Sequence, residues 1–270
     1  NTYTANIDWD YIECNSQMDA AVYIMDMANS DGSGSSAVDD SKQSNYMVYV
    51  NGHTLNNNSD YNARYIPATQ GFFVHANAQG AKLHIDYQKA ISHNCNMRYN
   101  ASKNSIKSPE LKMQAISKST DATLIYFEKG ANSGFDSKLD AYKMFGGAKN
   151  VVELYTYSDD YNMCINAYDL DNCNNTIKLA YKLEGEPQQT TLSPSKFNFT
   201  DQRVFLRDKK LGVEEEMFDG YQYNLSARSP IFSHGNDITV PVVSLHPLRP
   251  SPMSSNKQTM TSAAVRSMSM

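Results

Sequence analysis

Carboxylates between residues 26 and 40 are the first groups whose type and spacing could carry chemistry. They surround a Gly/Ser-rich stretch, and carboxylate oxygens are ligands that Ca²⁺ prefers. An EF-hand alignment fails, because placing Gly32 at the sixth position puts Met27 first and Val38 twelfth. A looser calcium site and a solvated loop both remain open, and calcium is the one cofactor that the sequence suggests. The four candidate ligands are Asp26, Asp31, Asp39 and Asp40.

Tyrosine is frequent, with 18 residues. Exposed aromatic rings can stack on sugar rings, whereas tyrosine also commonly covers the faces of β-sheets. Both interpretations apply to the tyrosines in the second half of the chain. The candidate ligand-binding residues there are Tyr155, Tyr157, Tyr161, Tyr221 and Tyr223.

Four cysteines occur without a CxxC pair, so no zinc signature is present. Cys164 and Cys173 flank a short segment and could meet across a hairpin as a disulfide, which would suit an oxidising compartment. The alternative is that they are unpaired thiols, buried as small apolar side chains. The sequence leaves both possibilities open.

The stretch "YIPATQGFFVHA", residues 65–76, combines polar groups with a dense apolar run. Gly71 permits a bend before a strand, and we assign Gln70 to holding that bend by hydrogen bonding. His75 and His84 lie on neighbouring predicted strands and could face each other across a hairpin. We interpret them as surface or packing residues rather than as ligands.

Catalytic signatures are absent from the sequence. It contains no GxSxG, HExxH, GxxxxGK[ST] or paired CxxC motif. Glycoside hydrolysis needs two carboxylates across a cleft, which spacing along a strand-rich chain cannot show. We therefore expect no enzymatic activity and assign no catalytic residue.

The composition excludes two classes of partner. The net charge of −5, without a cluster of Lys or Arg, argues against nucleic-acid binding. No run of 18 apolar residues occurs, so we expect no membrane span. The chain opens without an initiator Met, a basic region or an apolar region, and we expect it to be a mature or truncated product.

Apolar residues alternate with polar ones along most of the chain, which predicts short strands and an all-β fold. Turn-rich connections without helical periodicity favour β-sandwiches over a βαβ fold. We expect inward-facing residues to include Phe72, Val74, Leu124, Tyr126, Leu179 and Leu206. The predicted strands are 21–27, 46–52, 71–77, 81–87, 111–117, 122–128, 151–158, 163–169, 176–183, 196–200, 203–208 and 221–227.

Two consecutive β-sandwich domains, Ig-like or jelly-roll-like, account for this pattern. The first covers residues 1–95, a polar linker covers 96–107, and the second covers 108–238. Residues 31–45 form a Gly/Ser/Asp loop inside the first domain. The Pro/Ser/Met-rich tail, residues 239–270, is predicted to be largely disordered after one brief apolar run.

Several stretches, in order, resemble a known family. "NTYTANIDW" is similar to its G-N-P-Y-P-x-x-x-D-W opening, "AVYIMD" to its next strand, and "YIPATQGFFVHA" to its I-x-P-x-Q-G-F-F-V signature. "TLIYFEKGANSGFDSKLDAYKMFG" resembles its F-D-x-x-x-D-A-x-K-x-F-G segment, and "VELYTYSDDYNMCINAYD" and "VFLRDKKLGVEEEMFDGYQYNLSA" complete the set. The family comprises large secreted and surface proteins of Bacteroidetes that end in a type IX secretion sorting domain.

The resemblance covers about residues 1–238 and implies noncatalytic β-sandwich units, with export to the cell surface or medium. It carries over no catalytic residue. This chain departs from the family after residue 238, where the closing strand gives way to the tail and no sorting domain follows. Loss of that strand would leave the second sandwich with an unpaired edge.

We therefore expect a noncatalytic structural or adhesive segment of an exported surface protein, with a surface glycan or another surface protein as partner. The alternative is a carbohydrate-binding or accessory module of a secreted hydrolase. A third possibility is calcium-stabilised adhesion through residues 31–40. The sequence does not indicate the oligomeric state.

Overall fold

The computed structural model describes residues 1–25, 46–56, 62–92, 108–146, 149–158, 160–169, 171, 176–186, 188–199, 202–209, 211–225 and 241–247. Within these residues the regular secondary structure is almost all β-strand, with only two short helices, which confirms the all-β prediction. The predicted loop 31–45 and the predicted linker 96–107 lie outside the described residues. No helix in the described part is long and apolar enough to cross a membrane.

The N-terminal part, up to residue 92, forms three small sheets with strand orders β6-β1-β9, β2-β8 and β5-β4-β3-β7. Short elements η1 and α1 connect some of these strands. The elements are β1 Asn6–Asp8, η1 Trp9–Tyr11, β2 Ile12–Cys14, β3 Val22–Met25, β4 Tyr46–Val50, β5 His53–Leu55, β6 Tyr65–Ile66, β7 Phe72–Phe73, β8 Leu83–Ile85, α1 Tyr87–Ala90 and β9 Ile91–Ser92.

A tight hairpin joins β4 to β5. Asn51 and Gly52 both have positive φ, at 47° and 81°, as a two-residue type I′ turn requires. The turn sets the register that pairs Val50 with His53 and Val48 with Leu55. It therefore places two strands, rather than the one predicted over residues 46–52, against the C-terminal part.

The C-terminal part, from residue 108, forms an 11-stranded sheet of order β18-β17-β20-β15-β13-β14-β11-β10-β16-β19, with β12 paired to β14 off this path. Its one parallel pair among the described strands is β11 with β14. The strands are β10 Glu110–Ile116, β11 Thr120–Glu128, β12 Ala141–Tyr142, β13 Val152–Ser158, β14 Tyr161–Asp169, β15 Thr176–Leu183, β16 Thr190–Asn198, β17 Gln202–Asp208, β18 Val213–Met217, β19 Tyr223–Leu225 and β20 Pro241–Pro247.

This sheet curls so that its two ends pack on one core. Leu206 of β17 and Met217 of β18 belong to the same buried cluster as Leu111 of β10. Two hydroxyl groups close the fold at its edge, since Tyr221 donates to Glu215 and Tyr223 to Asp208, each over 2.8 Å. The arrangement fits a β-sandwich, with the inner faces of the curled sheet opposed.

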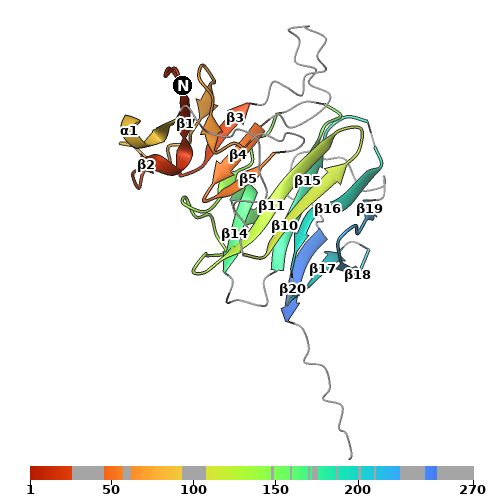
Figure 1. Ribbon diagram of the computed structural model, residues 1–270. Coiled ribbons are helices and arrows are strands. Elements are labelled where there is room, and N and C mark those ends of the chain that lie inside the picture. The colour runs from red at the N-terminus through yellow and green to blue at the C-terminus, as the bar shows by residue number, and fades with distance from the viewer. Residues whose placement is uncertain are drawn as a thin grey trace, which may run out of the picture.

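Strand β11 is buried on both faces. Ile125 and Phe127 face the core of the curled sheet, while Leu124 and Tyr126 face a second cluster that also contains Val48 of β4. Each fully buried side chain of this size contributes about 1.5–3 kcal/mol relative to an exposed one. The N-terminal and C-terminal parts thus share a core along β11 (Figure 1), and their division into two separate sandwiches stays a prediction.

The predicted inward residues follow the same pattern. Leu124, Tyr126, Leu179 and Leu206 are buried. Phe72 and Val74 are only partly buried and pack against the N-terminal core. Phe73, their neighbour, is 50% exposed.

Strand β20 corrects the prediction for the tail. Residues 241–247 fall in the range 239–270 that was predicted to be largely disordered, yet β20 pairs with both β15 and β17. Its prolines stand at the first and last positions of the strand, where a missing N–H interrupts the ladder least. The predicted unpaired edge is therefore wrong at this place in the sheet, and residues 248–270 lie outside the described residues.

Candidate functional site

A strip of aromatic side chains runs along the junction between the N-terminal part and the strands β12 and β14. Phe135 stacks on Tyr142 with ring centroids 4.1 Å apart and planes 19° apart. Tyr161 stacks on Phe135 at 5.4 Å and lies 6.0 Å from Tyr142, so the three rings form a compact cluster, and His75 meets Tyr142 edge-on at 4.7 Å. We call these four residues the aromatic rim.

Local pairing holds Tyr142 at this junction. It lies in β12, whose register with β14 shifts between Ala141 and Tyr142. Its backbone N–H donates to the hydroxyl of Tyr23 in β3 over 2.7 Å. One hydrogen bond therefore joins the rim directly to the N-terminal sheet.

A buried carboxyl group shapes the turn that carries Phe135. Asp140 accepts the backbone N–H of Asp136 over 2.6 Å and that of Ala167 over 2.7 Å. Burial, the main cause, raises the pKa of Asp140 to about 7, although these two hydrogen bonds act in the opposite direction. The carboxyl group fixes the turn 136–140 against β14.

His75 is oriented by a carboxylate beneath it. Its Nδ1 lies 2.7 Å from Oδ2 of Asp19, a residue with no exposed surface, whose Oδ1 accepts from Asn77 over 2.8 Å. Because the carboxylate accepts, Nδ1 carries the hydrogen, and in the uncharged form of the ring Nε2 then keeps a lone pair. The His75 side chain is 47% exposed, so Nε2 can accept a hydrogen bond from a ligand.

The exposed part of the rim suits a ring-shaped, hydroxyl-rich ligand. Tyr161 is 41% exposed. Burial raises the pKa of Tyr142 to about 12, so its hydroxyl stays protonated near neutral pH. A flat aromatic face with a hydrogen-bond acceptor beside it can bind the apolar face and the hydroxyl groups of a sugar.

A further aromatic pair lies next to the rim in sequence. Phe73, two residues before His75, meets Tyr46 edge-on with centroids 6.1 Å apart. Because Phe73 is half exposed, this pair extends the aromatic surface on the N-terminal side.

The structure does not bring the five candidate tyrosines together. Tyr155, Tyr221 and Tyr223 are buried, so no sugar ring can stack on them in this structure. Tyr157 is half-buried, with the Lys178 ammonium 5.4 Å from its ring centroid. Only Tyr161 lies in the aromatic rim.

The histidine prediction also changes. His75 follows β7, which pairs with β3, whereas His84 lies in β8, which pairs with β2. The two histidines therefore belong to different sheets, and the partner of His75 is Asp19. Gln70 holds the bend as predicted, since its side chain donates to the carbonyl of Gly71 over 2.9 Å.

The metal and disulfide predictions fall largely outside the described residues. Asp26, Asp31, Asp39 and Asp40 all lie there, and the described part contains no group of three or more His, Cys, Asp or Glu side chains able to hold a metal ion. Cys164 is a buried free thiol whose Sγ lies 3.1 Å from the carbonyl of Tyr142. Cys173 is outside the described residues; since Cys164 is free, this structure does not contain the predicted disulfide, and Cys164 fits the alternative of an unpaired, buried thiol.

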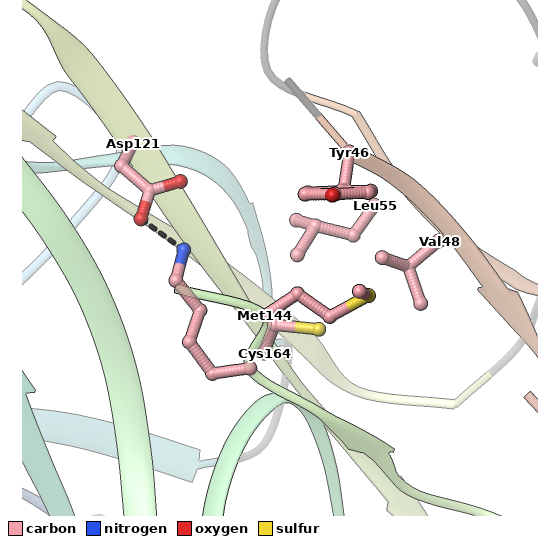
Figure 2. Close-up of a pocket in the computed structure, with 7 residues that line it drawn as sticks. Tyr46, Val48, Leu55, Asp121, Met144 and Cys164 are labelled. Atoms are coloured by element: carbon pink, nitrogen blue, oxygen red, sulfur yellow. Dashed lines mark hydrogen bonds and ion pairs between the residues drawn. The ribbon is translucent and has the colours of Figure 1, made fainter. Parts of the chain in front are cut away.

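A second polar feature lies deeper in the same junction. The ammonium group of Lys143 donates to Oδ2 of Asp121, and both side chains are buried. Figure 2 shows Asp121 on one side of a small cavity, with Tyr46, Val48 and Leu55 of the N-terminal sheet on the other. The cavity, about 10 Å³, has room for one water molecule. It is too small for an organic ligand.

A buried imidazole lies between the two parts as well. His53 stacks on Tyr126 with centroids 3.7 Å apart, and its Nδ1 is 3.8 Å from Glu110, beyond hydrogen-bond distance. Burial, with a smaller contribution from the charge of Lys196, lowers the pKa of His53 to about 4. His53 is therefore neutral near neutral pH and packs as a ring.

Comparisons with known proteins give one match. A family model described as a domain of unknown function, DUF8693, matches residues 1–233. No curated protein and no solved structure matches the chain.

Proposed function

The chain belongs to the DUF8693 family, whose description names no activity, and from the geometry of the rim we propose that it is a noncatalytic adhesive module that binds a glycan. The observation that carries this proposal is the cluster of the exposed Tyr161 with the half-buried Phe135 and Tyr142 beside His75. Aromatic stacking supplies affinity for the ring of a sugar. The acceptor on His75 supplies orientation.

Two features support a binding role over a catalytic one. The Asp19–His75 pair has the form of a general base and its orienting group, but a nucleophile or second acid at hydrogen-bond distance from the ring of His75 is missing from the contacts of the described residues. The neighbours of the ring are aromatic side chains. They favour stacking over proton transfer.

We place the module at the cell surface or outside the cell. The resemblance to secreted Bacteroidetes proteins with a type IX sorting domain supports this location, as does the strand-rich, mildly acidic composition, with a net charge of −5. The same rim would serve an accessory module of a secreted hydrolase. The genes and modules next to this sequence distinguish these two settings.

A glycan array probed with the purified chain tests the proposal. We expect binding to at least one class of oligosaccharide, with loss of binding in Tyr161→Ala and His75→Ala. Tyr87→Ala is the matched control, because Tyr87 is 65% exposed but lies in α1, whose main contacts are with η1 and β9 and not with the strands of the rim. Binding that survives both rim substitutions, or no binding on the array, would contradict the proposed site. Turnover of a bound glycan would contradict the noncatalytic role.

A further inference from the structure

A lysine and an aspartate are held in contact beneath the aromatic rim. Lys143, next to β12, and Asp121, in β11, have side chains only 3% and 2% exposed. The ammonium group donates to Oδ2 of Asp121, which also accepts the backbone N–H of Leu154 over 2.7 Å. The amine nitrogen is thus fixed against a carboxyl group, in a place that bulk water does not reach.

A third ionisable group stands beside this pair. Glu153 of β13 is buried, and its carboxyl group accepts the N–H of Gly146 over 2.7 Å. Burial raises the pKa of Glu153, and the charges of Lys143 and Asp121 both act on it. A buried carboxyl group with a raised pKa, within electrostatic range of the pair, is suited to general acid–base work.

The surroundings of Lys143 and Asp121 favour formation of an amide between the amine and the carboxyl group over hydrolysis of that amide. Apolar side chains line the cavity next to the pair, among them Val48, Leu55 and Met144 (Figure 2). Exclusion of bulk water shifts the equilibrium toward an amide, and fixed contact between the reacting groups removes the entropic cost of bringing them together. The cavity can receive one released water molecule.

We propose that Lys143 and Asp121 form an intramolecular isopeptide bond. The ammonium group of Lys143 gives a proton to the carboxyl group of Asp121 that it contacts, and the resulting amine attacks Cγ of Asp121, forming a C–N bond. One carboxyl C–O bond then breaks, and that oxygen leaves as water with two protons, both of which come from the lysine ammonium. The nearby Glu153 carboxyl group, which interacts electrostatically with both partners, assists the loss of the second proton. An ammonium and a carboxylate thus become one neutral amide and one water, without an oxidant or another reactant.

The bond would tie two segments across the fold. Its ends are 22 positions apart in the sequence, and it would join β11, which is buried on both faces, to the chain that carries Tyr142. An adhesive module under tension would then keep its rim in place against the core. This inference does not depend on glycan binding.

The intact mass of the purified full chain, measured under reducing conditions, is the direct test. We expect a mass lower than that of the sequence by one water molecule. We also expect a branched tryptic peptide that links the segments containing Asp121 and Lys143. Glu153→Gln should slow the appearance of this species, and Lys143→Arg should abolish it. Lys182→Arg is the control and should keep it, since Lys182 contacts Glu153 only at 4.0 Å and is 32% exposed.

An intact mass equal to that of the sequence, with no branched peptide after prolonged incubation of the folded chain, would overturn the proposal. Lys143 and Asp121 would then be an ordinary buried ion pair. If Lys143→Arg does not fold, the mass of the unsubstituted chain still decides. Glycan binding does not change the intact mass of the chain. The isopeptide bond and the glycan-binding role can therefore be refuted independently.

Discussion

Two buried aspartates at the same junction differ in whether their partner side chains are exposed to solvent. Asp19 has no exposed surface and holds His75, whose ring is half exposed at the rim. Asp121 is equally buried, but its partner Lys143 is buried too. The first carboxylate therefore presents a polar group to a ligand, whereas the second locks two segments together. An aspartate whose partner is exposed to solvent can belong to a binding surface. An aspartate whose partner is buried instead holds two segments of the fold together.

The largest expected effect comes from removing each aspartate in turn. Asp121→Ala leaves a buried ammonium without its carboxylate, which costs about 3–5 kcal/mol of unfolding free energy. Asp19→Ala leaves neutral donors near the surface and should cost about 1–3 kcal/mol. Denaturant titration of both variants checks the order. Equal losses of unfolding free energy in the two variants would contradict the distinction between the buried pair and the half-exposed pair.

A third buried aspartate, which has no cation partner among the described residues, sharpens the comparison. The pKa of Asp140 is raised to about 7, so the folded state binds more protons than the unfolded state between about pH 4 and pH 7. The contribution of Asp140 to stability should therefore be greatest below this window and fall as pH rises through it, by on the order of a few kcal/mol.

Unfolding curves across this range for the native chain and Asp140→Asn test the assignment. The difference in unfolding free energy between the two should change with pH. A constant difference would mean that Asp140 does not titrate in the window.

His53 provides the corresponding contrast with His75. Its pKa is lowered to about 4, so the unfolded state binds more protons between about pH 6.5 and pH 4. The contribution of His53 to stability should be fully present above pH 6.5 and fall as the pH drops through that range. His53→Phe keeps a ring against Tyr126 and should flatten this part of the curve, as measured by thermal unfolding at several pH values. If His53→Phe loses stability below pH 6.5 as steeply as the native chain, groups other than His53 cause that loss.

The smallest effect on stability is expected at the rim. Tyr161→Ala removes an exposed ring and should change unfolding free energy by about 0.5 kcal/mol or less. Glycan affinity should nevertheless fall about tenfold or more, because a central aromatic contact is lost. Calorimetric titration measures both effects against Tyr87→Ala. A large loss of stability in Tyr161→Ala would show that the ring supports the fold instead.

The sequence predicted the long strands well. Strand β11 was expected over 122–128 and spans Thr120–Glu128, because an unbroken apolar run is typical of a strand buried on both faces. Most two- and three-residue strands of the N-terminal part give too little alternation to detect, although β7 and β8 lie inside the predicted strands 71–77 and 81–87. Strand β18 contains Glu214–Glu216 and falls between the predicted strands 203–208 and 221–227. It is an exposed edge strand, where charges are common.

The candidate site was less predictable. Tyr161 was identified from its residue type, and His75 was considered and assigned to packing. Asp19 lies 56 positions from His75, and nothing local in the sequence connects them. Phe135 and Tyr142 occur in a segment that the family resemblance marks only as architecture. Contacts between distant segments, set by β12 and β14, create the rim, so residue spacing could not reveal it.

The proposed adhesive role is tested most directly by NMR titration of the chain with the oligosaccharide that gives the highest array signal. The rim should show the largest shifts, in the ring signals of His75, Phe135, Tyr142 and Tyr161, while the buried rings of Tyr221 and Tyr223 stay unchanged. Saturable binding whose shifts map to another surface, with the rim signals unmoved, would contradict it.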